Sequence, residues 1–251
     1  MSAPGASVPV TTGRPGRWQV ATVVGDHWET PRARTLRLDL GGELAFLAGQ
    51  HLLLRLTAPD GYTAQRSYSI ASAPSSTPGG SRFVELTVER LPGGEVSQFL
   101  CDEVVVGDTL EVRGPIGRWF VWSGDEPVVG VAGGSGTVPL MAMVRRARAL
   151  GRPELVRLLV SARRPEDLYF ADELPGPGTT VVWTREAPPG SGRAPGRLRA
   201  ADLAALLDGD GQGRTVFVCG SPPFCDAVTD LLAELSVPAT RVRVERFGPS
   251  R

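Results

Sequence analysis

Residues Val128–Pro139 read VVGVAGGSGTVP, which joins an apolar strand-like run to a glycine-rich turn and to a predicted helix over Val138–Leu150. Glycines before a helix bring its free N–H groups close to a ligand, so such a turn is a place for phosphate groups. Two glycines fit the G-x-G pattern of dinucleotide-binding turns, while Pro139 stands where a third glycine is usual. The alternative is a turn whose glycines only allow tight packing. The predicted pyrophosphate ligands are Gly134, Ser135, Gly136 and Thr137.

The chain beyond residue 127 continues this alternation of strands and helices. The predicted strands are Val128–Ala132, Val156–Val160, Thr180–Trp183, Val216–Cys219 and Val242–Val244. The predicted helices are Val138–Leu150, Glu166–Leu174, Ala201–Leu207 and Phe224–Leu235. The stretch Glu186–Gly196 is rich in Pro, Gly and Ser, and is expected to be a mobile surface loop. Strand–helix alternation predicts an α/β domain with a doubly wound parallel sheet.

The first half of the chain has short apolar runs separated by Pro, Gly and Asp. These runs are Trp18–Val24, Thr35–Leu40, His51–Thr57, Arg82–Val88 and Thr109–Val112. Only Val96–Val106 is expected to form a short helix. Six or so short strands predict a small antiparallel β-barrel. We therefore expect two domains, at residues 17–123 and 127–251, after a flexible tail at 1–16.

The segment Arg66–Ser72 (RSYSIAS) combines a cation, an aromatic ring and hydroxyl groups on one predicted strand. The guanidinium of Arg66 offers a rigid fork of donors that suits a pyrophosphate. Tyr68 alternates with Ser67 and Ser69, so a strand places the ring on one face and both hydroxyls on the other. This set can hold a phosphate and pack against a flat ring system. The alternative is an ordinary strand with an exposed arginine.

A second glycine turn precedes the short helix of the first half, at Gly93–Ser97 (GGEVS). Its free backbone N–H groups lie at the positive end of a small helix dipole, and Ser97 adds a hydroxyl donor. Gly94, Val96 and Ser97 are therefore candidate phosphate ligands. The alternative is a hairpin turn followed by a surface helix.

Two strand ends of the α/β half carry further candidate residues. The second strand ends at Ser161, and Arg163 and Arg164 follow where an NAD-selecting site usually has an acidic residue. Hydroxyl and cationic groups suit a 2′-phosphate instead, and Arg185 after the third strand can join them; a solvated loop is the alternative. The fourth strand ends in Cys219-Gly220, whose small side chains leave room for a flat nicotinamide, or are simply buried.

Composition excludes several other classes of protein. The formal net charge is 0, with 27 basic and 27 acidic residues and no basic run, so nucleic acid is not an expected partner. Three cysteines and two histidines form no metal-ligand spacing, and such sparse cysteines fit a reducing cytoplasm. No apolar run of 18 residues predicts a membrane span, and no leader pattern is present.

Taken together, these motifs resemble the ferredoxin–NADP reductase superfamily over roughly residues 18–248. Arg66–Ser69 matches its flavin motif R-x-Y-S, and Gly94–Ser97 resembles its flavin-phosphate turn. Gly133–Pro139 resembles its nicotinamide-nucleotide turn, and Cys219-Gly220 its C-G motif. The resemblance implies a flavin-binding barrel followed by a nicotinamide-nucleotide-binding domain, with both ligands meeting between them.

The same resemblance implies roles for individual residues. Arg66 would bind the flavin phosphate, Tyr68 would lie against the isoalloxazine, and Ser69 would hydrogen-bond near its N5. Cys219 would line the nicotinamide pocket beside Gly220. Many members end in an aromatic residue that covers the flavin, and Phe247 is the candidate here. Members with a fused [2Fe–2S] domain need more cysteines than the three present, so a separate acceptor is expected.

The function predicted from the sequence is an FAD-dependent oxidoreductase. It would pass a hydride from NADPH, or alternatively NADH, to the flavin and then release electrons to a separate acceptor such as an iron–sulfur ferredoxin or flavodoxin. Ser69 and Cys219 would stand nearest the reacting atoms. Two alternatives stay open. One is a flavin or quinone-type reductase with a small-molecule acceptor, and the other is a non-catalytic electron-transfer or nucleotide-sensing subunit.

Overall fold

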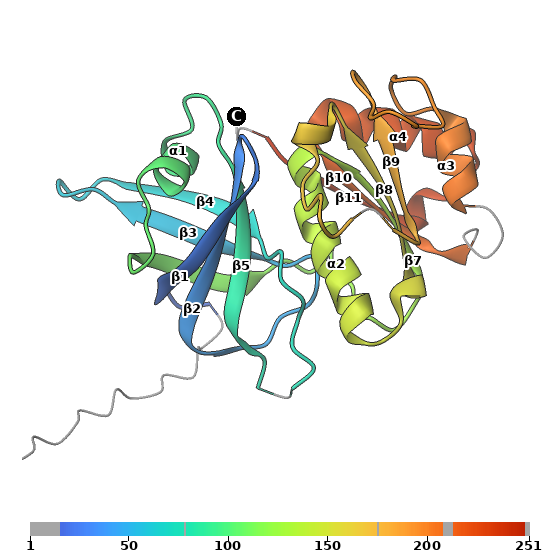
Figure 1. Ribbon diagram of the computed structural model, residues 1–251. Coiled ribbons are helices and arrows are strands. Elements are labelled where there is room, and N and C mark those ends of the chain that lie inside the picture. Colours follow the sequence, from blue (N-terminus) through green and yellow to red (C-terminus); the bar gives the residue numbers. More distant parts are fainter. Residues whose placement is uncertain (1–15, 78, 175, 208–212, 249–251) are drawn as a thin grey trace, which may run out of the picture.

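The computed structural model describes residues 16–77, 79–174, 176–207 and 213–248. The tail predicted at 1–16 lies almost entirely outside the described residues. Two sheets stand side by side, an antiparallel one formed by the first half of the chain and a parallel one formed by the second (Figure 1). Within the described residues, no helix is long and apolar enough to cross a membrane.

The antiparallel sheet has six strands in the order β4-β3-β6-β1-β2-β5. Its elements are β1 (Gln19–Thr30), β2 (Ala33–Leu44), β3 (His51–Thr57), β4 (Thr63–Ser69), β5 (Ser81–Glu89), α1 (Glu95–Asp102) and β6 (Thr109–Ile116). A bridge between Ile70 and Leu86 joins the end of β4 back to β5, so the sheet curls into the predicted barrel. Leucine and valine side chains from alternate strand positions fill its interior, because successive residues of a strand point to opposite faces.

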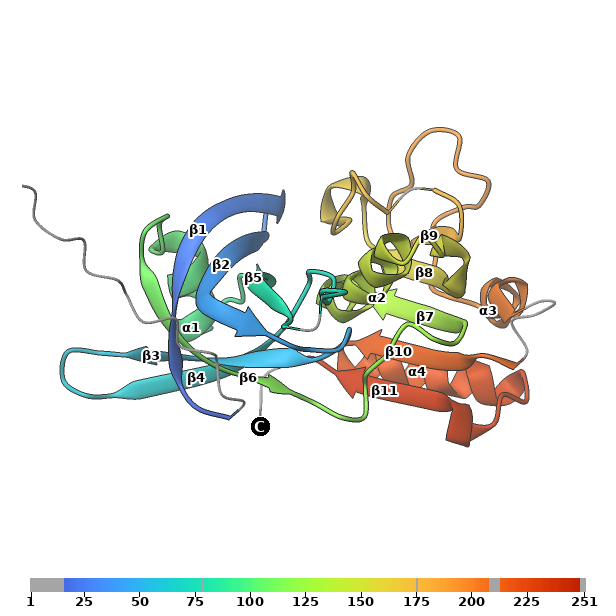
Figure 2. The same ribbon diagram turned by 90° about the horizontal axis from the view of Figure 1, so that it is seen from below.

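The parallel sheet has five strands in the order β11-β10-β7-β8-β9. Its strands are β7 (Val128–Gly133), β8 (Val156–Ala162), β9 (Thr179–Trp183), β10 (Thr215–Gly220) and β11 (Val242–Arg246). Helix α2 (Thr137–Ala149) packs on one face of this sheet, whereas α3 (Ala200–Leu207) and α4 (Pro222–Glu234) pack on the other. The doubly wound arrangement expected from the sequence is therefore confirmed. Both views place α2 as the helix nearest the barrel (Figure 2).

The helix predicted over Glu166–Leu174 is wrong. Only a short 3₁₀ turn forms there, at Pro165–Asp167, and an irregular segment follows. Phe170 has a left-handed backbone conformation with φ 55°, which an α-helix does not accept. Leu168, Tyr169, Phe170 and Leu174 are buried in the hydrophobic cluster that α2 shares with residues of the barrel domain. The apolar residues of this segment therefore serve the contact between the two domains.

Smaller differences concern the ends of elements. Strands β1 and β2 run on to Thr30 and Leu44, whereas the predicted helix over Val96–Val106 ends at Asp102. The flavin-motif strand ends at Ser69, and the following residues leave the β3 ladder to meet β5. The loop predicted at Glu186–Gly196 has neither helix nor strand.

Candidate active site

Strand β4 presents a cation and a hydroxyl group that have few partners of their own. Arg66 is exposed, and its Nη1 donates only to the carbonyl oxygen of neighbouring Gln65, at 2.7 Å. Ser69 is only 5% exposed, yet its hydroxyl forms no hydrogen bond with any residue in the described ranges. Tyr68 packs against the barrel core, and burial raises the pKa of its phenol. Strand β4 thus carries an exposed guanidinium at Arg66, a half-buried ring at Tyr68 and, at its end, the buried Ser69 hydroxyl, with Ser67 exposed between Arg66 and Tyr68.

His51 is a neighbour of this strand that the sequence analysis did not single out. It is the β3 residue paired with Ser69 in the antiparallel ladder, and it also pairs with Ile116 of β6. Side chains directly opposite each other in such a ladder lie on the same face. Burial lowers the pKa of the His51 imidazole, so the ring is neutral at neutral pH beside the Ser69 hydroxyl.

The first glycine turn leads into α1, as predicted. Its Ser97 hydroxyl does not face outward: it donates to the carbonyl oxygen of Gly94 at 3.1 Å and accepts from the N–H of Leu91 at 3.2 Å. Ser97 is only 6% exposed. Its side chain therefore holds the turn in shape, while the backbone N–H groups at the start of α1 remain the groups that can meet a phosphate.

The second glycine turn leads from β7 into α2 through a 3₁₀ turn at Gly134–Gly136. Thr137 is fully buried, and its hydroxyl donates to the carbonyl oxygen of Gly134 at 2.8 Å. Gly134 is exposed and has a left-handed φ of 56°, which glycine adopts without strain. Ser135 is half-buried beside it. The turn lies against β10 and also against β5 of the barrel.

The edge of β10 brings Cys219 and Gly220 next to this turn and to the end of the chain. A Cβ atom added to Gly136 would lie 2.1 Å from the carbonyl oxygen of Cys219. Cys219 is completely buried, and burial raises the pKa of its thiol well above the usual value, so it is a neutral packing group here. The N–H of Phe247 donates to the carbonyl oxygen of Gly220 at 2.8 Å, which anchors the candidate aromatic residue beside the C-G pair.

Glu245 is a second residue that the sequence analysis missed. It pairs with Cys219 across the β10–β11 ladder, and its Oε2 is buried without a hydrogen-bond partner among the described residues. Burial raises its pKa from 4.5 to about 7. An acidic group that titrates near neutrality at the edge of a sheet is typical of a functional site. No local signal marks it, because its burial depends on the register of β11 against β10.

A pocket of about 400 Å³ opens beside the carboxyl ends of β8 and β9. Its lining includes Ser161 and three arginines, Arg163, Arg185 and Arg197, with no acidic side chain. None of these arginines forms an ion pair within the described residues. Arg164 is different, because it forms ion pairs with two glutamates. Its Nη1 lies 3.4 Å from Glu166 Oε1, and its Nε lies 3.8 Å from Glu186 Oε2. Of the two neighbouring arginines singled out in the sequence, only Arg163 therefore lines the pocket, and Arg197 is added from the loop before α3.

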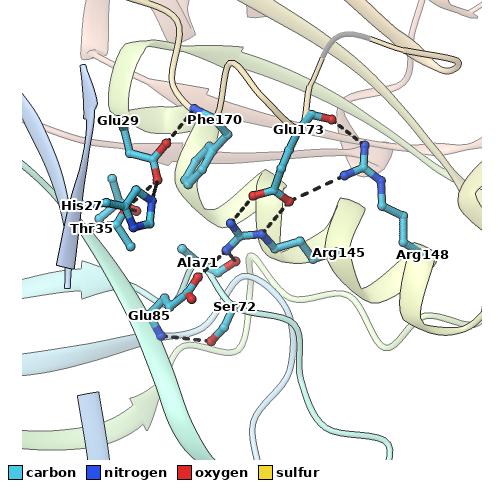
Figure 3. Close-up of polar contacts among 11 residues, drawn as sticks. His27, Glu29, Thr35, Ala71, Ser72, Glu85, Arg145, Arg148, Phe170 and Glu173 are labelled. Carbon is cyan, nitrogen blue, oxygen red and sulfur yellow. Dashed lines mark hydrogen bonds and ion pairs between the residues drawn. The ribbon is translucent and has the colours of Figure 1, made fainter. Parts of the chain in front are cut away.

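The segment just beyond the flavin-motif strand is in direct contact with α2, the helix that follows the Gly134–Gly136 turn (Figure 3). Arg145 of α2 donates to the carbonyl oxygen of Ala71, two residues beyond Ser69, at 3.1 Å. A second contact joins Phe170 to β1, since the Phe170 N–H donates to Glu29 Oε2 at 3.1 Å. The structure thus places Ala71, just beyond the flavin-motif strand, and helix α2 at one boundary between the domains.

Comparison with known proteins gives the same division of the chain. Residues 22–121 match the family described as oxidoreductase FAD-binding domain, and residues 131–230 match the oxidoreductase NAD-binding domain. The NADH oxidoreductase HCR of Escherichia coli is 34% identical over 87% of this chain and 65% of its own length. The ferredoxin reductase component of a Mycobacterium tuberculosis 3-ketosteroid-9-alpha-monooxygenase is 32% identical over 91% of this chain and 64% of its own length. The chain therefore spans just under two thirds of both relatives.

A solved structure shows the same likeness. The cytochrome P450 reductase of Amycolatopsis superposes with a TM-score of 0.77 at 28% identity, over 94% of this chain and 72% of that chain. The likeness covers both domains and the boundary between them.

Proposed function

The chain belongs to the ferredoxin reductase-like family of FAD- and NAD-binding oxidoreductases, and from this premise we propose that it oxidises NADPH through bound FAD and passes the electrons to a separate acceptor. The flavin would accept a hydride and release electrons one at a time, which is chemistry that the cofactor supplies. The protein's own part is to bind, orient and shield the two nucleotides.

The observation that carries this proposal is the contact between the two domains next to the predicted sites, where the Gly134–Gly136 turn lies against β5 and α2 is bonded to Ala71. Ser69, with its unused hydroxyl, ends the flavin-motif strand, and Ala71 just beyond it contacts α2. Helix α2 begins at the glycine turn proposed for the nicotinamide nucleotide. A hydride moves only between atoms in near contact, so two nucleotide sites that share a boundary support transfer between them.

The residues present suit the flavin phosphate and ring. Arg66 has no acidic partner within the described residues, so its guanidinium is free to form charge-assisted bonds with a phosphate. The start of α1 adds backbone N–H donors and the positive end of a helix dipole. We assign Tyr68 to the ring face, Ser69 to hydrogen bonding near N5, and Phe247 to the cover.

For the coenzyme, we propose NADPH rather than NADH. Arg163, Arg185 and Arg197 line one pocket at the carboxyl edge of the sheet, where such folds bind nucleotides, and no carboxylate there neutralises them. An adenosine 2′-phosphate is the anion that this position would meet. Ser161 at the pocket wall can add a hydroxyl donor.

For the acceptor, we propose a separate redox protein such as a ferredoxin or flavodoxin. The 3-ketosteroid relative is described as the ferredoxin reductase component of a monooxygenase, which supports an acceptor of this class. The test is anaerobic titration of the purified flavoprotein with NADPH, followed by addition of a ferredoxin, a flavodoxin, a quinone or free flavin. Bleaching of the flavin band followed by transfer to the protein acceptors supports the proposal. A flavin that NAD(P)H does not reduce would refute it.

The coenzyme choice has its own test and a matched control. Arg163→Ala and Arg197→Ala should each raise the Michaelis constant for NADPH about ten- to a hundredfold and leave that for NADH nearly unchanged, since a charge-assisted bond is worth about 1.5–3 kcal/mol. Arg164→Ala is the control, because Arg164 is held by two glutamates outside the pocket. Equal use of both coenzymes by the unmodified protein would exclude a 2′-phosphate site.

A further inference from the structure

We propose that Arg145 is a positioning residue for hydride transfer: it holds the helix that starts at the nicotinamide turn against the strand end that carries the flavin motif. This inference rests on the proposed function, since it concerns the distance between the two ligands. It assigns Arg145 no contact with either of them.

Arg145 makes four polar contacts, and they come from both domains (Figure 3). On the barrel side it pairs with Glu85 Oε2 of β5 at 2.7 Å and donates to the carbonyl oxygen of Ala71 at 3.1 Å. On its own side, its Nε and Nη2 both reach the carboxylate of Glu173 in the segment after β8. The guanidinium carbon also lies 5.1 Å from the centre of the Phe170 ring. Only 16% of its side chain is exposed.

The barrel side of this contact is rigidly tied to the flavin motif. The N–H of Ala71 donates to the carbonyl oxygen of Glu85 at 2.8 Å, and the N–H of Glu85 donates to the Ser72 hydroxyl at 3.1 Å. The N–H of Ile70 donates to the carbonyl oxygen of Gln50 at 3.0 Å. A displacement of Glu85 or Ala71 therefore moves the end of β4 with it, including Ser69.

The helix side of the contact is tied to the nicotinamide turn. Arg145 stands eight residues after Thr137, which is about 12 Å along the helix axis. A tilt of α2 by about 5° about the Arg145 contact would move the turn by about 1 Å over that length. A misplacement of 1 Å can cost about a hundredfold in the rate of a transfer step.

The neighbouring arginines of α2 show why this role falls to Arg145. Arg148 contacts the carbonyl oxygen of Glu173 at 2.8 Å and no residue of the barrel domain within the described ranges. Arg146 reaches Ser76 at 2.8 Å, in the loop between β4 and β5, but not the residues next to Ser69. Arg145 alone among the three touches the segment that directly follows the flavin motif and a β5 carboxylate at once. Arg148→Met is therefore a matched control.

The experiment is rapid anaerobic mixing of the flavin-loaded protein with a series of NADPH concentrations. It separates the limiting rate of flavin reduction from the NADPH concentration that gives half of that rate. In Arg145→Met we expect the limiting rate of flavin reduction to fall about ten- to a hundredfold. The half-saturating NADPH concentration and the flavin content should stay within about twofold of the unmodified protein, and the flavin absorption spectrum should keep its shape. Arg148→Met should keep the rate within about twofold of the unmodified protein.

Two further variants keep the test decisive if Arg145→Met does not accumulate as a flavoprotein. Arg145→Lys keeps the charge but cannot reach all partners, and Glu85→Gln keeps an acceptor without the charge, so both should slow reduction several-fold. The inference would be overturned if both variants kept the limiting rate of the unmodified protein, or if Arg148→Met lowered that rate as much as Arg145→Met does. If the unmodified protein itself is not reduced, the proposed function has failed, which is a different result.

Discussion

The turns at Gly94–Ser97 and Gly134–Thr137 contain the same hydrogen bond. The hydroxyl of the last residue donates to the carbonyl oxygen of the first glycine, at 3.1 Å in the first turn and 2.8 Å in the second. Both hydroxyls are buried, and both turns open a helix. The two domains, one with an antiparallel sheet and one with a parallel sheet, thus form their glycine turns with the same local bond.

What lies beneath the two turns is different. The nearest neighbours of a Cβ atom on Gly94 would be local in the chain, namely the Ser97 hydroxyl at 2.4 Å and Leu91 at 3.1 Å. A Cβ atom on Gly136 would meet the backbone of β10, with the Cys219 carbonyl oxygen at 2.1 Å and the Gly220 nitrogen at 2.6 Å. The first turn is therefore self-contained, whereas the second is part of the edge of the parallel sheet. A bulky substitution in the second turn should therefore destabilise the whole parallel-sheet domain.

The largest expected effect comes from Gly136→Val. The new side chain must displace the backbone of β10, so we expect destabilisation of the protein by about 3 kcal/mol, the upper part of the range for overpacking. Thermal unfolding monitored by circular dichroism measures it. From the sequence alone, the same change would be expected only to block the approach of a pyrophosphate. An unchanged melting temperature would show that the sheet edge yields easily.

Arg66→Ala probes whether the self-contained turn can hold the flavin phosphate without help from β4. Loss of a charge-assisted bond should weaken flavin retention by about 1.5–3 kcal/mol. Fluorescence of released flavin, followed during dilution, measures the change. Arg55→Ala is a suitable control, because Arg55 lies on β3 and is already paired with Glu111 at 2.6 Å. Equal retention in both variants would remove Arg66 from the site.

Glu245 lies beneath the second turn, at the Cys219 position of the ladder, and makes that region sensitive to pH. Because burial raises its pKa from 4.5 to about 7, the folded protein keeps a proton that the unfolded chain releases. Its contribution to the free energy of unfolding should fall by about 1–3 kcal/mol between pH 4.5 and 7, and stay level above. Glu245→Gln should abolish this slope in denaturant titrations. An identical slope in the variant would contradict the assignment.

The smallest expected effect concerns the shared hydroxyl bond itself. Ser97→Ala removes both a donor to Gly94 and an acceptor for the Leu91 N–H, whereas Thr137→Val removes only one bond. We expect a cost of about 1 kcal/mol for each, slightly more at Ser97, in chemical denaturation. Flavin retention should follow the change at Ser97 alone. A change at Thr137 that also releases flavin would mean that the two turns are coupled.

The features predicted correctly from the sequence are those with local causes. The strands of both sheets follow from apolar periodicity and the glycine turns from their spacing, since neighbouring residues decide both. The alternation of strands and helices predicts a helix at Glu166–Leu174, but the apolar residues of this segment lie in a hydrophobic cluster shared with the other domain. Arg163 and Arg164 look alike in the sequence, and only their partners separate them. Glu245, His51 and Arg145 depend on strand register or on the domain boundary, which no local pattern contains.

The Phe170 N–H belongs to one domain and donates a hydrogen bond to Glu29, a carboxylate of the other domain. Glu29 accepts this N–H and also the Thr35 hydroxyl at 2.7 Å, so the acceptor is fixed within the barrel domain. Local separation of the two domains would break this bond and expose the amide to deuterium exchange without unfolding of either domain. Deuterium exchange at the Phe170 amide therefore reports opening between the two domains. Nucleotides bound at this boundary should slow exchange at that amide.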